Sequence, residues 1–464
     1  MKLSGDFEKN FRIYLMSALS WIGPQESLDH KAGDLYSFRG GLKYTNDYFN
    51  GGLGLRLFVL GNEKKLNENI NVDTAHSIFT AITEKAYEEI KQKNPEITKA
   101  LNEYLDDDMI TVLIDEFKRI VNELQGNYKI SLLTNLIELT DVDILTIGNV
   151  HFSKSTFFFS EDFPDTIRPQ PAITLLGTTE QSREEVISKN LDHVALTTEA
   201  SGYHHKDEKS LVFYKALAEF KQVFAFLVFC RHFLSNVKNK EFEIKTKAVQ
   251  PSGAFKGNKS GIQRYYLWGE KDKGCAVEFS TLWSTIDLAR EAFIIDTETL
   301  EALKKSCYLE QYNSLLQGID KNRIRGKIRR CLDWFLKSHL EDDSTDEVVS
   351  LFIGLETLLA TGPDPFRGAA DDLAENVALL MTPHPDERYS CKKDFKKAYR
   401  LRCKIIHSGE VIDWDKDWVT VRSIRNYVVW SLRGILSHLD EISRYGKEEG
   451  SMQEYFDRLK LGGM

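Results

Sequence analysis

Residues 391–410, CKKDFKKAYRLRCKIIHSGE, contain an arginine and a histidine five positions apart, Arg402 and His407. Cleavage of RNA without a metal requires that the 2′-hydroxyl lose a proton and attack its own phosphate. A histidine exchanges protons near neutral pH and suits that transfer. An arginine presents a fixed fork of donors, which suits the negative charge that develops on the phosphorus centre. The two residue types therefore favour metal-independent cleavage of RNA.

A helix must position these two residues. Phe395, Tyr399, Arg402 and Ile406 recur at i, i+4, i+7 and i+11, so they share one stripe of an α-helix. An arginine in a stripe that packs inward needs a partner or a task, because an unpaired buried charge is costly. Ser408 and Gly409 then predict the helix end, which puts His407 in the last turn. On an ideal helix, however, residues five apart point roughly 140° away from each other.

Glu356 is the first candidate partner for Arg402. It lies within the apolar segment Val348–Leu359 and is expected to be partly buried. We interpret it as a structural carboxylate that pairs with Arg402 or with another arginine, and a role as general base is the alternative. The simplest alternative for the whole motif is a core arginine satisfied by a carboxylate, with an incidental histidine at the helix end.

The same helix has a second face that is strongly basic. Between Lys392 and Lys404 there are seven Lys or Arg residues against one Asp, a local charge of +6, although the chain has a net charge of −9. A second basic segment, Lys321–Arg330, precedes it. We predict sequence-independent phosphate contacts here, the alternative being ordinary solvated faces. The candidate RNA-binding residues are Lys393, Lys396, Lys397, Arg400 and Lys404.

The R-x4-H spacing within YRLRCKIIHSG resembles the HEPN superfamily, specifically its Apea-like branch. The segments KIRRCLDWFLKSHLEDDSTDEVVSLFIGLETLLA and FRGAADDLAENVALL resemble the helices that precede the motif in that branch, so the resemblance covers about residues 320–440. It implies an endoribonuclease of a bacterial anti-phage, abortive-infection system that cuts RNA, often tRNA. It also implies a homodimer in which two motif helices meet and form a composite site, with Arg402 and His407 as catalytic residues.

Two rival functions come from other classes. One is a HEPN-like module that binds RNA or protein without catalysis. The other is a toxin held inactive by a nucleotidyltransferase that modifies a tyrosine two residues after the histidine, but here that position is Gly409. Two further patterns are weaker: Glu243 and Lys245 in a strand resemble half of a metal-dependent nuclease site, and His204-His205 could hold a metal. We expect no metal and no cofactor.

The fold class predicted is α+β, with a mixed N-terminal α/β region followed by an all-α HEPN-like bundle. We place an N-terminal sensor region, with room for two subdomains, at 1–310, the bundle at 320–440 and a polar tail at 441–464. No second chemistry is evident in residues 1–310, so we expect them to restrain the nuclease and to bind a phage-derived activating ligand.

The patterns also predict individual elements. Helices are expected between 73 and 124, broken at Pro95 and at Asp106–Asp108, and strands between 128 and 159 around Gly148. Residues 164–182 read as a loop, 209–234 as a buried helix, 263–279 as a hairpin and 282–312 as helical. Six cysteines without a CxxC pair and the absence of a long apolar run predict a cytoplasmic protein that does not enter a membrane.

Overall fold

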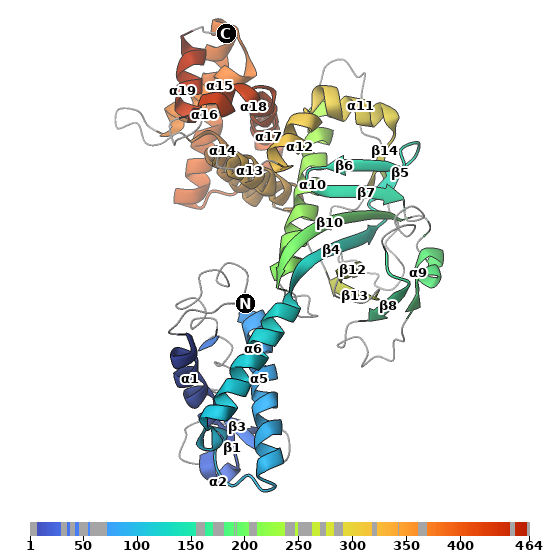
Figure 1. Ribbon diagram of the computed structural model, residues 1–464. Helices are drawn as coiled ribbons and strands as arrows, with labels where there is room; N and C mark the ends of the chain where they lie inside the picture. The colour runs from blue at the N-terminus through green and yellow to red at the C-terminus, as the bar shows by residue number, and fades with distance from the viewer. Residues whose placement is uncertain are drawn as a thin grey trace.

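The structure of the chain is a computed structural model that describes 18 segments. They are residues 7–28, 35–37, 42–45, 54–55, 72–154, 163–169, 181–189, 191, 193–203, 211–236, 246–248, 262–269, 275–282, 291–317, 323–341, 343–360, 369–445 and 451–461. The predicted α+β region followed by an all-α bundle is confirmed (Figure 1).

The first part of the chain is a helical unit with its own core, and it extends away from the rest (Figure 1). Pro95 and Asp106 break the helical region where predicted, and the Asp106 side chain caps the second long helix by accepting from the Met109 N–H at 2.7 Å. The elements are α1 (Phe7–Ala18), η1 (Leu19–Trp21), β1 (Ile22–Gly23), α2 (Gln25–Leu28), β2 (Leu35–Ser37), β3 (Lys43–Thr45), α5 (Val72–Lys93), η4 (Leu101–Tyr104) and α6 (Asp107–Leu124).

An eight-stranded sheet follows, and β13 and β8 are its one parallel pair among the described strands. In spatial order it comprises β6 (Ile144–Ile147), β7 (Val150–Lys154), β10 (Val194–Tyr203), β4 (Gln125–Thr134), β12 (Ile262–Gly269), β13 (Cys275–Leu282), β8 (Thr166–Pro169) and β9 (Gln181–Ser182). The predicted hairpin is confirmed as β12 and β13, with Tyr265 opposite Phe279. A smaller sheet contains β11 (Thr246–Ala248), β14 (Glu291–Ile295) and β5 (Ile137–Leu139).

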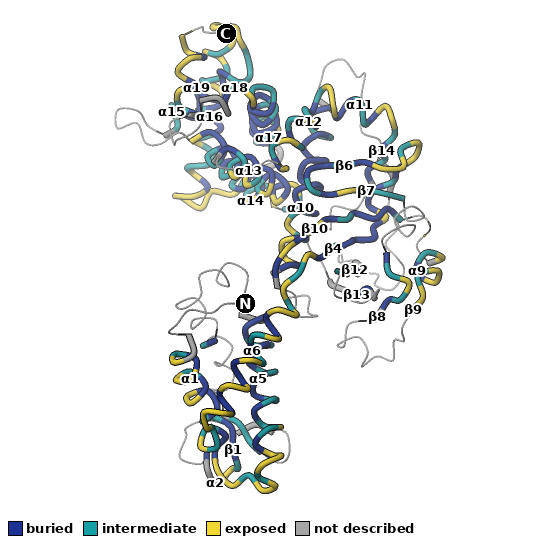
Figure 2. The backbone as a smooth tube through the Cα atoms, in the orientation of Figure 1, coloured by how far each residue is buried: buried dark blue, intermediate teal, exposed yellow. Residues whose placement is uncertain are grey.

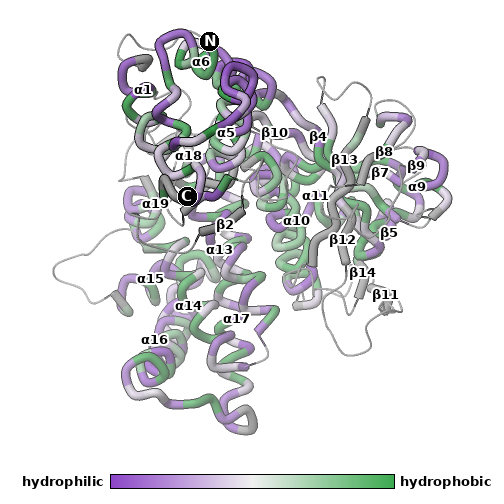
Figure 3. The backbone as a smooth tube through the Cα atoms, turned by 90° about the horizontal axis from the view of Figure 1, so that it is seen from below, coloured by the Kyte–Doolittle hydropathy of each residue, from purple (hydrophilic) through white to green (hydrophobic). Residues whose placement is uncertain are grey.

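Helix α10 (Leu211–Asn236) lies between the large sheet and the bundle (Figures 1 and 3). Strand side chains alternate between the two faces of a sheet, so Tyr265 packs against Phe213 of α10 at 5.1 Å between ring centroids. The next residue, Tyr266, faces the opposite way and contacts Phe163 at 5.8 Å. The run from Val223 to Cys230 is buried all round the helix, as predicted (Figure 2).

The bundle shares its hydrophobic core with α10 and the sheet. Phe226 of α10 stacks on Tyr312 at 4.1 Å, and Phe233 meets Trp430 edge-on at 5.3 Å. The architecture changes near residues 310–320 from α+β to all-α, but one continuous hydrophobic core spans that boundary. The remaining helices are α9 (Arg183–Lys189), α11 (Thr297–Ser306), α12 (Leu309–Gln317), α13 (Arg323–Leu340), α14 (Ser344–Leu359), α15 (Ala369–Met381), α16 (Pro385–Ser408), α17 (Trp414–Ser437), α18 (Leu439–Tyr445) and α19 (Ser451–Lys460).

Three predictions about elements were wrong. The polar tail at 441–464 contains α19, which buries Met452, Tyr455, Phe456 and Leu459 because their spacing places them on one helical face. Within 282–312, predicted as helical, β14 is a strand that pairs with β5 and β11. The proline-rich segment 164–182 was predicted as a loop, yet β8 and β9 add to the sheet there, with Pro169 at the end of its strand. None of the described helices is long and apolar enough to cross a membrane.

Candidate active site at the end of α16

Helix α16 begins and ends with the signals expected of a helix of this length. Pro385 occupies its first turn with Asp386 and Glu387, where the missing N–H and the negative charges are favourable. Gly409 adopts a left-handed conformation with φ 65°, and its N–H bonds to the Ile405 carbonyl at 3.1 Å. The predicted end at Ser408 and Gly409 is confirmed, so His407 does lie in the last turn.

The inner face of α16 packs against α14 and α17, but not along the whole predicted stripe. Phe395 is buried and contacts Phe352 at 5.9 Å and Tyr427 at 5.2 Å. At the C-terminal end the core residue is Ile405, whereas Ile406 is 45% exposed. The prediction for Ile406 was wrong because the buried arc turns toward Ile405 in the last turn, which leaves Ile406 at its edge.

Arg402 has the carboxylate partner that the sequence predicted. Its Nη2 lies 3.1 Å from Glu356 Oε1 and 3.3 Å from Oε2, so α16 is tied to α14. The Tyr399 hydroxyl donates to Glu356 Oε1 at 3.4 Å, and the Arg402 guanidinium lies 5.5 Å from the centre of the Tyr399 ring. Burial, together with the charge of Glu356, raises the pKa of Tyr399, so its hydroxyl stays protonated and able to donate.

The pairing of Arg402 is incomplete. Its Nε is buried and has no hydrogen-bond partner among the described residues, and its side chain is 18% exposed. A buried donor without an acceptor costs about 1–3 kcal/mol, so an unsatisfied group of this kind calls for an explanation. An acceptor that reaches the guanidinium when a ligand is bound would supply one.

His407 is exposed and has no ion pair or hydrogen bond in the described part of the chain. The structure does not bring it together with Arg402: one side chain is turned inward toward Glu356 and the other faces solvent. This is the divergence expected for residues five apart on one helix. A single chain therefore presents the two groups separately.

The basic face of α16 is largely paired. Five of the seven Lys and Arg residues between 392 and 404 have a carboxylate within 4 Å among the described residues. The pairs on the predicted RNA-binding face are Lys396–Asp371, Lys397–Asp394 and Lys404–Glu410. Lys393 and Arg400 are exposed without such a partner in the described residues. Exposed ion pairs contribute at most about 1 kcal/mol, so phosphates can displace these carboxylates at little cost.

The sequence patterns did not predict that the hydroxyl of Tyr399 would belong to the site. Tyr399 was placed only in the apolar stripe, although its position three residues before Arg402 puts both on the same face. The two weaker candidates, Glu243 with Lys245 and His204 with His205, lie outside the described residues. Within the described residues, no group of three or more His, Cys, Asp or Glu side chains is arranged to hold a metal ion.

Comparisons with known proteins add no relative: no family model matches the sequence, and neither curated proteins nor solved structures give a significant match. The geometry of α14 and α16 therefore carries the functional argument.

Proposed function

We propose that this protein is a metal-independent endoribonuclease whose site is built around Arg402 and His407 at the end of α16. The observation that carries the proposal is the state of Arg402. It is held by Glu356 and Tyr399 on one side, has an unsatisfied Nε, and lies on a helix that ends in an exposed histidine. A purely structural arginine at this position would be expected to use more of its donors.

Each side chain has a role in the proposed reaction. His407 takes the proton of the RNA 2′-hydroxyl, which then attacks the adjacent phosphate and expels the 5′-oxygen of the next nucleotide. A second histidine or a water molecule donates a proton to the departing 5′-oxygen. Arg402 stabilises the charge of the pentacoordinate phosphate, while Glu356 and Tyr399 position its guanidinium. Lys393 and Arg400 supply phosphate contacts outside the reacting centre.

A homodimer completes this site. Two apolar side chains near His407 are exposed, Ile406 at 45% and Val411 at 71%. Exposed apolar residues gathered near a site are typical of surfaces that bind another protein. A second copy packed there would bring its own Arg402 toward His407, which resolves the divergence of the two side chains along one helix.

The resemblance to Apea-like HEPN proteins supplies the biological setting of the proposal. In that setting the nuclease belongs to a cytoplasmic anti-phage defence system, and its cleavage of RNA, with tRNA as a candidate target, arrests growth. The N-terminal region then binds a phage-derived ligand that activates it. Because α10 and the bundle share one core, a signal in the sheet region has a packed route to α13 and α17.

The test is cleavage of tRNA and total RNA by the purified full chain, with and without EDTA. We expect cleavage in both conditions and products that end in a 2′,3′-cyclic phosphate and a 5′-hydroxyl. A strict requirement for magnesium would instead point to Glu243 and Lys245. If no RNA is cut although RNA binds, the second candidate, a non-catalytic binding module, takes its place. The Arg402–Glu356 ion pair is the observation that favours that candidate.

A further inference from the structure

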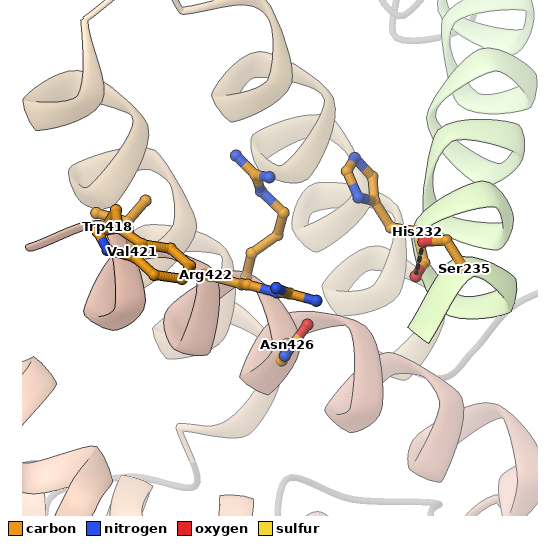
Figure 4. Close-up of a pocket in the computed structure, with 7 residues that line it drawn as sticks. His232, Ser235, Trp418, Val421, Arg422 and Asn426 are labelled. Carbon is orange, nitrogen blue, oxygen red and sulfur yellow. Dashed lines mark hydrogen bonds between the residues drawn. The ribbon is translucent and has the colours of Figure 1, made fainter. Parts of the chain in front are cut away.

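The described residues form a second site, a cleft of about 350 Å³ between the end of α10 and the first half of α17 (Figure 4). Its volume lies at the lower end of the roughly 300–1,000 Å³ typical of small-molecule sites. The lining residues are His232, Ser235, Trp418, Val421, Arg422, Arg425 and Asn426. Among them there are two arginines and no acidic residue, so the lining favours an anion.

The two arginines differ in how they are held. Arg425 donates through Nε and Nη2 to Oε1 of the buried Glu347, which fixes its guanidinium. An arginine has five N–H donors, so Arg425 keeps three for a ligand. Arg422 lies one turn earlier on α17, is exposed, and has no ion pair within the described residues. Together they provide one fixed and one adaptable donor group, which suits a phosphate.

The cleft also has an aromatic wall. Trp418 lies one turn before Arg422 on the same face of α17, and it is 45% exposed. An exposed indole is an unusual residue to leave in water, and it offers a flat surface on which a nucleobase can stack. Ser235 and Asn426 add a hydroxyl and an amide, groups that bond to a base edge or a ribose hydroxyl (Figure 4).

We propose that this cleft binds a nucleoside phosphate, with the base stacked on Trp418 and the phosphate held by Arg422 and Arg425. His232 of α10 lines the cleft, and its pKa is lowered to about 3, first by burial and then by the nearby Arg425, His339 and Arg231. A bound phosphate offsets those charges. The ligand is a free nucleotide or one nucleotide of an RNA strand, which share this chemistry.

The experiment titrates the full chain with three probes: adenosine monophosphate, inorganic phosphate, and a 2′-O-methyl trinucleotide that cannot be cleaved. Calorimetry and tryptophan fluorescence measure the affinity. For Arg422→Gln we expect the Kd of the nucleotide and of phosphate to rise about ten-fold. For Trp418→Ala we expect about a ten-fold rise for the nucleotide and less than about two-fold for phosphate, because phosphate cannot stack.

Matched controls are Arg458→Gln, an exposed arginine on α19, and Tyr214→Ala, an aromatic on α10 that is 50% exposed. Both should leave every Kd within about two-fold of the parent chain. Tighter binding of the mononucleotide identifies a free nucleotide as the ligand, and tighter binding of the trinucleotide identifies an RNA strand. The proposal is overturned if no probe binds, or if the controls weaken binding as much as the cleft variants do. No RNA is cut in this experiment, so its failure is separate from that of the proposed nuclease.

Discussion

The two ends of α14 each hold an arginine with a glutamate, but in different ways. At the N-terminal end only 9% of the Glu347 side chain is exposed, and Arg425 of α17 donates hydrogen bonds to it through two nitrogens. At the C-terminal end Glu356 is 30% exposed, and Arg402 of α16 contacts it through one nitrogen and leaves Nε unsatisfied. The carboxylate of the Arg425–Glu347 pair is buried and accepts two hydrogen bonds from its arginine. In the Arg402–Glu356 pair, by contrast, the arginine has donors that bond to no partner among the described residues.

We propose that this difference separates a structural pair from a functional one. Removal of a partner from a buried pair leaves a charge without compensation and costs about 3–5 kcal/mol. When Arg402 is removed, the Glu356 carboxylate that is left behind is 30% exposed and water can solvate it, so the cost is lower, about 1 kcal/mol or less. We propose that the end of α14 that contributes less to stability is the end at which an arginine binds substrate.

The largest effect expected is on RNA cleavage. Arg402→Ala should reduce kcat about 100-fold or more, since loss of one donor to a developing oxyanion costs roughly 100–1,000-fold. His407→Ala should have a similar effect through lost proton transfer. The control is Arg400→Ala, which removes an exposed arginine from the same helix and should raise KM while kcat stays within about three-fold. Full activity in both site variants would move the chemistry elsewhere, and circular dichroism will check that all three chains fold.

A composite site at a twofold axis makes a sharper prediction. When Arg402→Ala and His407→Ala chains are mixed and allowed to exchange, half of the dimers are mixed, and each mixed dimer has one intact site out of two. Activity should recover to about a quarter of the parent value. Cleavage is measured before and after exchange, with each variant alone as its control. A monomeric parent chain that cuts RNA at its full rate would rule out a shared site.

The other end of α14 should show its effect in stability. Arg425→Ala leaves Glu347 buried without its partner, and we expect the free energy of unfolding to fall by about 2–3 kcal/mol, less than for a fully buried pair because 29% of the Arg425 side chain is exposed. Arg402→Ala should lower it by about 1 kcal/mol or less. Urea titrations of the full chain measure both. If both variants lose the same free energy of unfolding, the two ends of α14 do not differ in the way we describe.

Local pattern was sufficient to predict much of this fold. The helix breaks at Pro95 and Asp106, the β12–β13 hairpin, the buried run Val223–Cys230 of α10 and the end of α16 all follow from short-range signals. The pairing of Arg402 with Glu356 was also predicted, because a charge in a burying stripe has few ways to be satisfied. Those features depend on residues within one or two turns of each other, or on a strong energetic constraint.

Features that depend on tertiary contacts were not predicted. A strand such as β14 forms because β5 and β11 offer hydrogen bonds, and its five residues carry no periodic signal long enough to compete with a helical interpretation. Burial of Ile405 in place of Ile406 depends on where the neighbouring helices end. The cleft with Trp418 and Arg422 escaped notice because α10 and α17 lie almost 200 residues apart in the sequence.

The smallest effect concerns pH at the structural end of α14. The pKa of His232 is about 3, below its ordinary value of 6.5, so above pH 6.5 the histidine is neutral in both the folded and the unfolded chain. As the pH falls from 6.5 toward 3, the unfolded chain binds a proton that the folded chain does not, and the free energy of unfolding decreases. The full effect is about 1.4 kcal/mol per pH unit, and His232 is partly exposed, so we expect about 0.5–1 kcal/mol per unit.

His232→Gln should remove that much of the slope between pH 6 and 4.5 in urea titrations, whereas His384→Gln, an exposed histidine before α16, should not. Arg425 contributes to the low pKa, so Arg425→Ala should also reduce the slope, while Arg402→Ala should leave it unchanged. An identical slope in the parent and the His232→Gln chain would show that folding does not lower the pKa of this histidine.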